Sequence, residues 1–233
     1  MRIAFVDTFG LCYDGTTLTK RGLGGSESAV ILCSRELAKI GFDVTVFNDC
    51  VHDDAQPGVY DNVQYRPLQE IESTTDSYDV LVGSRSVAAF APAHMKERFK
   101  TFSYMPDFSN IQQKSRHKVL WMHDTFCDGD DLIDTFLLDG YINEVFVLSD
   151  FHLDYVTNCD HGKKRMFEVM KKYMFITRNG MTKYHDWVDI TKKDPNHFVY
   201  NSSVTKGMRP LVNQIWPRIR EAIPNARLTV IGG

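Results

Sequence analysis

The sequence predicts an α/β fold in which a parallel sheet carries helices on both of its faces. Short apolar runs typical of buried strands recur along the chain, and helical patterns separate them. The first unit of strand, helix and strand is complete by residue 47. Strands separated by helices on this scale are typical of a parallel sheet covered on both faces. The 233 residues, 43% of them hydrophobic, allow one large domain, or one domain and part of another.

The opening unit is organised around the stretch Gly22-Leu23-Gly24-Gly25-Ser26-Glu27. A strand is expected before it at residues 3–6, and a helix after it, in which apolar residues recur at intervals of four: Ala29, Cys33 and Leu37. We expect Ser26 to be the N-cap and Gly41 to end the helix before a strand at residues 42–47. Because a glycine pair at a helix N-terminus exposes backbone N–H groups, this stretch predicts a phosphate or polar-ligand site. A flexible strand–helix loop is the alternative.

The same alternation continues to residue 156. Further strands are expected at residues 62–66, 79–83, 118–122 and 144–148, and helical segments at 87–90, 130–138 and 151–156. In parallel sheets, ligands bind beyond the carboxyl ends of the strands. Polar groups in that position are Asp7, His123-Asp124 and Ser149-Asp150. These groups, with the glycine-rich stretch, are where the chemistry is expected.

The pattern of apolar and polar residues changes after residue 176. Residues 182–196 are polar and lack apolar periodicity, which is typical of a linker. A strand at 197–200, a helix bent at Pro217 and a strand at 227–231 follow, the helix being marked by Leu211, Ile215 and Ile219. Since one β–α–β unit cannot bury both faces of its sheet, we expect a second domain that is begun but not finished, and a chain that is a fragment.

Composition argues against several classes of protein. A net charge of −3 gives no basic surface for nucleic acid. One local cluster of basic residues is present: Lys163, Lys164, Arg165, Lys171 and Lys172. It forms either a solvated helix face or a contact for a phosphate-bearing ligand or membrane surface. Five cysteines without a Cys-x-x-Cys pair argue against a disulfide framework and a structural zinc site, so no metal ligand set is expected. No signal-peptide pattern or membrane-spanning apolar run occurs, so a cytoplasmic location is expected, with peripheral contact to the cytoplasmic membrane face as an addition.

Four segments together resemble a known family. They are Gly24-Gly25-Ser26-Glu27; residues 119–122 running into His123-Asp124; residues 145–149 with 176–180; and residues 200–207 with 216–219 and 226–233. In this order and at these distances the sequence resembles family 4 of the retaining glycosyltransferases. The family has the GT-B fold, in which two Rossmann-like domains face each other across a cleft. The resemblance implies an N-terminal acceptor-side Rossmann-like domain at 1–178, a linker at 179–196 and the beginning of a nucleotide-sugar-binding domain at 197–233.

The resemblance also implies an activity, the transfer of a sugar from a nucleotide-sugar donor such as a UDP- or GDP-sugar to a glycan, glycolipid or other acceptor. The configuration of the sugar would be retained, and neither a cofactor nor a metal would be required. His123 and Asp124 would form the catalytic part, with His123 orienting the sugar rather than abstracting a proton. Lys206 would neutralise the donor diphosphate. The remaining donor- or substrate-binding residues implied are Asp7, Gly24, Gly25, Ser26, Glu27, Ser149, Asn179, Ser202 and Ser203.

The sequence departs from the family pattern in two places. Members often carry an arginine a few residues before the lysine, where this chain has Tyr200-Asn201-Ser202. The glutamate-rich motif that holds the donor would lie beyond residue 233. We therefore expect little or no transferase activity from this chain alone.

The residues leave alternatives open. Glu27 could serve only the helix dipole, Asp7 could cap its loop, and Ser149 could cap the following helix. His123 could be structural or, with Asp124 and Cys127, bind a metal. A non-catalytic glycan- or nucleotide-binding module is one alternative function. A Rossmann NAD-dependent oxidoreductase, with a ribose-binding acid near Asn48-Asp49, is the other, although no Gly-x-Gly-x-x-Gly motif occurs.

Overall fold

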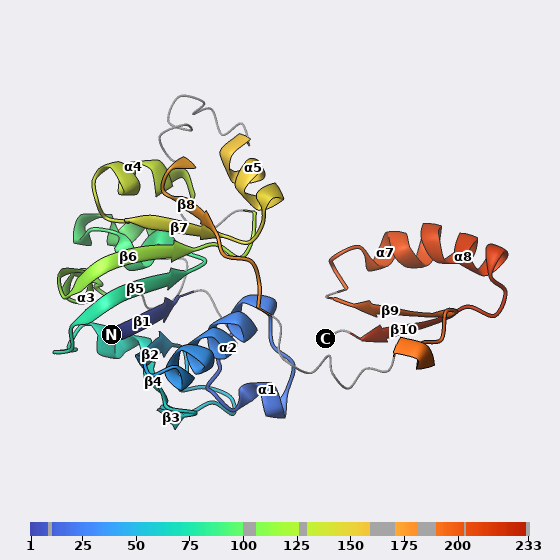
Figure 1. Ribbon diagram of the computed structural model, residues 1–233, viewed down its shortest axis with the longest axis horizontal. Coiled ribbons are helices and arrows are strands. Elements are labelled where there is room, and N and C mark those ends of the chain that lie inside the picture. The colour runs from blue at the N-terminus through green and yellow to red at the C-terminus, as the bar shows by residue number, and fades with distance from the viewer. Residues whose placement is uncertain are drawn as a thin grey trace. The chain divides into compact units, whose positions relative to one another are not determined.

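The computed structural model describes residues 1–8, 11–99, 106–125, 130–158, 171–180, 190–202 and 204–231. The chain divides into two compact units, Met1–Gly180 and Met181–Gly233. The first unit is an α/β unit with an eight-stranded, mostly parallel sheet flanked by helices (Figure 1). The predicted α/β class and Rossmann-like architecture are confirmed. The roles assigned to residues 1–178, 179–196 and 197–233 stay predictions.

The sheet of the first unit reverses its strand order at its centre. The order is β3-β4-β2-β1-β5-β6-β7-β8. The strands are β1 Arg2–Asp7, β2 Asp43–Asn48, β3 Gly58–Tyr60, β4 Val63–Pro67, β5 Tyr78–Ser84, β6 Ser115–Trp121, β7 Glu144–Val147 and β8 Met174–Ile176. β1 pairs in parallel with β2 on one side and with β5 on the other. Since the chain winds outward in both directions from β1, the carboxyl ends of β1 and β5 border the crevice where such sheets bind ligands.

Both faces of this sheet are buried. Successive side chains of a strand point to opposite faces, so one strand contributes apolar residues to the core on each side. In β1, Ile3 and Phe5 belong to one apolar cluster, whereas Ala4 and Val6 belong to the other. The helices are α1 Thr17–Lys20, α2 Gly25–Lys39, α3 Ser109–Gln113, α4 Ile133–Leu138 and α5 Asp150–Asn158. Short 3₁₀ helices span Leu68–Ile71, Val87–Phe90, Ala93–Phe99 and Asp130–Leu132. The near-continuous apolar runs of the central strands are thus explained by cover on two sides.

Helix α2 begins earlier than the sequence predicts. Gly24, in an extended conformation, is the N-cap, so the prediction that Ser26 caps the helix is wrong. Ser26 lies inside the first turn, and no side chain caps the helix. At the other end the prediction is confirmed: Gly41 has φ 94°, its N–H donates to Ala38, and the Phe42 N–H donates to Leu37. These two bonds form a Schellman motif, which requires the left-handed conformation that glycine adopts readily.

Two strands of the first unit were not predicted. β3 pairs antiparallel with β4 across the two-residue turn Asp61-Asn62, whose φ values of 49° and 62° are those of a type I′ hairpin. β8 pairs in parallel with β7 at the edge of the sheet. Each has only three residues, too few to show a periodic pattern. The other predicted strands are confirmed, although β6 begins at Ser115, three residues before the predicted strand at 118.

The second unit is one β–α–β element. β9 His197–Asn201 and β10 Arg227–Ile231 pair in parallel along their full lengths. Between them run α7 Met208–Pro210, a π-helical turn Leu211–Ile215 and α8 Trp216–Ala222. The widened turn ends at Ile215, two residues before Pro217, which has no N–H to donate to the preceding turn. Among the described residues of this unit only Ala226 is buried.

Residues 181–189 of the predicted linker lie outside the described residues; a 3₁₀ helix at Ile190–Lys192 falls in its described end. Within the parts of the chain that the structure describes, every helix is too short or too polar to cross a lipid bilayer.

Candidate functional site

The candidate site lies where the carboxyl ends of β1, β5 and β6 meet. Asp7 at the end of β1 pairs in register with Ser84 at the end of β5, and Ser84 with Trp121 at the end of β6. Arg85 follows β5 directly, and His123-Asp124 follows β6. The central strands therefore bring residues from distant parts of the sequence to one edge of the sheet, on the side where ligands bind.

Arg85 joins two carboxylates at this edge. Its Nη1 lies 3.2 Å from Glu27 Oε1, and its Nε lies 3.3 Å from Asp124 Oδ2. The Glu27 side chain is only 4% exposed, whereas that of Asp124 is 46% exposed. The backbone of Arg85 is left-handed, with φ 65°, and its N–H donates to the Trp121 carbonyl. A non-glycine residue in this conformation is strained, and such strain is found most often at functional sites.

Glu27 explains why residue 24 is a glycine. A Cβ at Gly24 would lie 2.2 Å from Glu27 Oε2, so any larger residue would displace the carboxylate. Glu27 Oε1 also accepts a hydrogen bond from the Leu11 N–H at 3.4 Å. Gly25 is different, because no described residue lies within 4 Å of a Cβ built there. An anion approaching this helix N-terminus would therefore meet the Glu27 carboxylate beside Gly24 and open space beside Gly25.

Asp7 is buried, with 2% exposure, at the end of β1. Its Oδ2 accepts a hydrogen bond of 3.1 Å from the hydroxyl of Tyr13, which is fully buried. Burial, with the nearby Asp7 charge as the next cause, raises the pKa of Tyr13 well above its usual value, so this hydroxyl stays a donor. These contacts favour a structural role for Asp7, which holds the loop after β1, rather than a role in contacting an acceptor.

His123 packs against the last residue of its own strand. The ring centroids of His123 and Trp121 lie 4.3 Å apart. Burial, followed by the charge of Arg85, lowers the pKa of His123 to about 4, and Asp124 opposes this shift. The ring is therefore neutral at pH 7. Its Nε2 is buried without a hydrogen-bond partner among the described residues.

Ser149 caps helix α5. Its Oγ accepts a hydrogen bond of 3.0 Å from the His152 N–H, in the first turn, which confirms the capping alternative for this residue. His152 Nδ1 accepts in turn from the Leu148 N–H at 3.2 Å. Burial lowers the pKa of His152 as well. Ser149 therefore supports the backbone next to the site.

The other predicted site residues are not gathered at this edge. Asn179 is exposed near the end of the first unit, and Ser202 and Lys206 belong to the second unit. Lys206 is exposed just after β9, and its carbonyl accepts from the Tyr200 hydroxyl at 2.8 Å. Ser203, Cys127 and the cluster Lys163, Lys164 and Arg165 lie outside the described residues. The structure thus brings together Glu27, His123 and Asp124 of the predicted set.

Arg85 is the functional residue that sequence reasoning missed. The signal was present, because Ser84-Arg85 directly follows the buried strand predicted at 79–83. The same rule that selected His123-Asp124, a polar residue directly after a buried strand, selects Arg85 as well.

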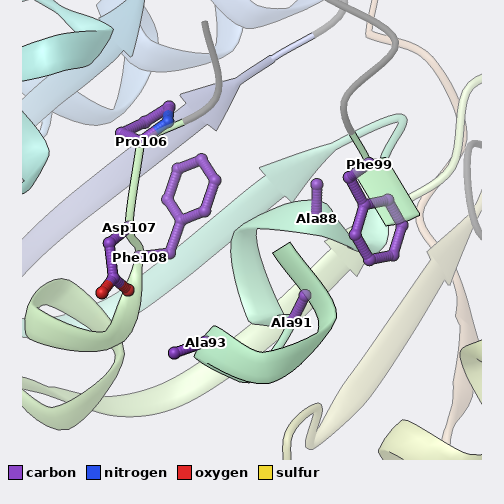
Figure 2. A pocket seen from close by; sticks show the side chains of 7 residues that line it. All are labelled: Ala88, Ala91, Ala93, Phe99, Pro106, Asp107 and Phe108. Carbon is purple, nitrogen blue, oxygen red and sulfur yellow. The ribbon is translucent and has the colours of Figure 1, made fainter. Parts of the chain in front are cut away.

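A small hollow lies beside the 3₁₀ helix Val87–Phe90 (Figure 2). Its lining residues are Ala88, Ala91, Ala93, Phe99, Pro106, Asp107 and Phe108. It has room for about one water molecule. Asp107 Oδ1 accepts from the Ser109 N–H at the start of α3, and the other lining residues are apolar. This hollow is therefore too small and too apolar for a polar substrate.

Compared with models of protein families and with curated proteins, the sequence matches none of them.

Proposed function

We propose that this protein is a retaining glycosyltransferase that moves a sugar from a nucleotide-sugar donor to a glycan or glycolipid acceptor. The observation that carries the proposal is the Arg85 cluster, a guanidinium between Glu27 and Asp124 beside a neutral His123, at the point where the strand order reverses. Sugars are recognised through directional hydrogen bonds to their hydroxyls, which carboxylates accept and a neutral imidazole donates or accepts. The GT-B domain arrangement is part of the proposal.

His123 orients the sugar in this mechanism. An imidazole with a pKa of about 4 is a weak base at pH 7, whereas an efficient general base has a pKa near the working pH. In this proposal Nε2, which has no hydrogen-bond partner among the described residues, becomes accessible when the donor binds and then holds one sugar hydroxyl. The geometry thus supports orientation over proton abstraction.

Glu27 and Asp124 have different roles because their burial differs. Glu27, almost fully buried and ion-paired, fixes the position of Arg85. Asp124, about half exposed, is accessible to an acceptor hydroxyl. The Arg85 guanidinium, whose charge the two carboxylates offset, holds Asp124 in place beside His123. Ser202 and Lys206 bind the donor diphosphate in this proposal, and neither a metal nor a cofactor takes part.

The side-chain contacts of Asn48 and Asp49, at the end of β2, disfavour the oxidoreductase alternative. Recognition of a dinucleotide ribose would need a free acid near Asn48-Asp49. Asp49 Oδ1 instead lies 2.8 Å from His52 Nδ1, and the Asn48 amide donates to the Tyr13 carbonyl at 2.7 Å. The Asn48 side chain thus holds the segment after β1, and the Asp49 side chain is paired within the loop after β2.

Ligand titration tests the proposal. The protein is titrated with UDP, GDP, NADH and a panel of nucleotide sugars while its melting temperature is followed, and transfer is assayed with a radiolabelled donor. We expect a nucleotide sugar to raise the melting temperature and NADH to leave it unchanged. Since little or no transfer is expected of this chain alone, transfer with retention would support the enzyme, whereas binding without transfer is expected of both the transferase and the non-catalytic binding module. A panel in which no nucleotide or nucleotide sugar shifts the melting temperature contradicts both.

Matched variants connect the binding to the site. Arg85→Ala and His123→Ala should abolish the ligand-induced shift. Arg116→Ala, at a side chain that is 86% exposed, and His94→Ala, at an exposed histidine, should leave the shift intact. If all four variants respond to ligand as the wild type does, the Arg85 cluster is not the binding site.

A further inference from the structure

A second cluster of reactive side chains lies away from the Arg85 cluster, at the end of β2. Atoms of Cys12, Asp49 and His52 able to bind a metal ion all lie within 4.8 Å of one another. The Asp49 carboxylate and His52 Nδ1 are 2.8 Å apart. The backbone N–H of His52 donates to Cys12 Sγ at 3.3 Å. A sulfur, an imidazole nitrogen and a carboxylate oxygen thus converge from two separate segments of the chain.

Backbone contacts hold these two segments together. The Tyr13 N–H donates to the Asp49 carbonyl at 3.0 Å, and the Asn48 amide donates back to the Tyr13 carbonyl. The Arg21 guanidinium donates to the Cys12 carbonyl and, through Nε, to Asp54 Oδ1 at 3.1 Å. Because neighbouring groups fix both segments, the three side chains meet without a large loss of conformational freedom on binding an ion.

A nucleophilic role fits this cluster poorly. A reactive cysteine needs a stabilised thiolate in an accessible position. Cys12 is only 7% exposed, burial raises the pKa of its thiol, and its Sγ donates to the His52 carbonyl. A bound cation removes this obstacle, since a coordinating thiol is deprotonated outright. Asp49 and His52 are exposed, which gives an ion access from solvent.

We propose that Cys12, Asp49 and His52 bind one zinc ion, with water as the fourth ligand. Thiolate and imidazole ligands select zinc over magnesium and calcium, which prefer oxygen alone. On binding, the Cys12 thiol releases its proton to solvent and Sγ exchanges its hydrogen bond to the His52 carbonyl for the bond to zinc. The ion ties the segment after β1 to the loop after β2. It is independent of the proposed sugar transfer.

Sequence spacing could not reveal this set. Position 12 lies far from positions 49 and 52, and no Cys-x-x-Cys pair marks a zinc site. Only the parallel pairing of β1 with β2 brings the two following segments together. The expectation that the chain has no metal ligands is therefore replaced by this proposal.

Metal titration of the reduced full chain tests it. After removal of metals with a chelator, the protein is titrated with Zn²⁺ and separately with Co²⁺. We expect one equivalent of Zn²⁺ to be retained through gel filtration and to raise the melting temperature. Co²⁺ should give a thiolate-to-cobalt charge-transfer band and the intense visible bands of a four-coordinate ion. Cys12→Ser should remove the charge-transfer band, and His52→Ala and Asp49→Asn should each weaken Zn²⁺ binding by at least about 100-fold.

Control variants make the test decisive. Cys33→Ser in helix α2 and His94→Ala remove a cysteine and an exposed histidine outside the cluster, and both should bind Zn²⁺ as the wild type does. Since the Asp49 and His52 side chains are exposed, their variants should fold even if Cys12→Ser does not. Failure of the wild-type chain to retain Zn²⁺, a Co²⁺ complex without the charge-transfer band, or equal affinity of the wild type and His52→Ala would each overturn the proposal.

Discussion

The guanidinium of Arg85 forms an ion pair with the buried carboxylate of Glu27, with 3.2 Å between Nη1 and Oε1. The two residues are 58 positions apart, and the pair joins the first turn of α2 to the end of β5. A carboxylate that is only 4% exposed loses its hydration and needs a partner to remain charged. The Glu27–Arg85 pair is therefore a structural link, and the cluster that it forms with Asp124 holds one cation between two carboxylates.

Removal of Arg85 should destabilise the protein through the charge left behind. In Arg85→Ala the Glu27 carboxylate stays buried without its cation, and we expect a loss of about 2 kcal/mol of unfolding free energy. Arg85 is itself 22% exposed, so the loss should stay below that of a fully buried pair. Urea denaturation of the wild type and the variant measures the difference.

A double variant separates charge burial from lost packing. Glu27→Gln in the Arg85→Ala background removes the uncompensated charge and should recover more than half of the lost stability. Arg116→Ala, at a weakly paired surface arginine, should change stability by less than about 0.5 kcal/mol. If the double variant is no more stable than Arg85→Ala, the Glu27 charge is not the cause of the destabilisation.

The left-handed backbone of Arg85 gives a separate expectation. At φ 65° a side chain costs about 1–2 kcal/mol relative to glycine. Arg85→Gly and Arg85→Ala lose the same ion pairs, yet Arg85→Gly should be more stable than Arg85→Ala by about 1 kcal/mol. Denaturant midpoints of the two variants measure this difference. Arg85→Ala matching or exceeding Arg85→Gly would mean that this position carries no backbone strain.

The long strands of the fold were predictable because two-sided burial produces apolar runs that stand out in the sequence. β1, β2 and β5 have this pattern, and the helix end at Gly41 has the residue that a Schellman motif requires. The N-terminus of α2 was misassigned because a serine is a common cap, whereas here an extended Gly24 starts the helix. The choice between the two depends on the position of Glu27, which no local pattern encodes.

The candidate site was predictable only in part, for a similar reason. His123 and Asp124 were identified because they directly follow a predicted buried strand, and Arg85 satisfies the same rule. What the sequence could not provide is the pairing, since which carboxylate the Arg85 guanidinium meets depends on the strand order around β1. Ser149 shows the opposite case, where the local capping alternative proved to be the correct one.

The two glycines before Glu27 should respond differently to alanine. In Gly24→Ala the new Cβ would lie 2.2 Å from Glu27 Oε2, so the carboxylate must move away from its present position. We expect a loss of about 1 kcal/mol and weaker ligand binding at Arg85. In Gly25→Ala, in the first turn of the helix, the new Cβ meets none of the described residues within 4 Å, so the change should be neutral or stabilising by up to about 1 kcal/mol.

Thermal unfolding and ligand titration of this matched pair measure both effects. The pair is informative because the two variants add the same methyl group at adjacent positions. Equal behaviour of Gly24→Ala and Gly25→Ala would show that the Glu27 carboxylate is not held against Gly24, and the assigned role of Glu27 in positioning Arg85 would be lost.

His123 should make stability depend on pH in a defined window. Its pKa is about 4 in the folded protein and near 6.5 when unfolded, so between these values the unfolded chain binds the additional proton. Stability contributed by the neutral ring is complete above pH 6.5 and is lost as the pH falls toward 4, by up to about 3 kcal/mol. His152, whose pKa is also lowered by burial, acts in the same direction.

The variant His123→Asn isolates this contribution. Carboxylates also titrate as the pH falls toward 4, so the quantity to measure is the difference in unfolding free energy between wild type and variant at pH 7.5 and at pH 4.5. We expect that difference to shrink by about 2 kcal/mol between the two pH values, because the wild type alone loses the neutral ring. Cys33→Ser, which removes no group that changes charge between these pH values, should keep a constant difference from the wild type. A constant difference for His123→Asn as well would mean that His123 takes up its proton equally in the folded and unfolded chains, and a neutral, sugar-orienting imidazole would no longer be tenable.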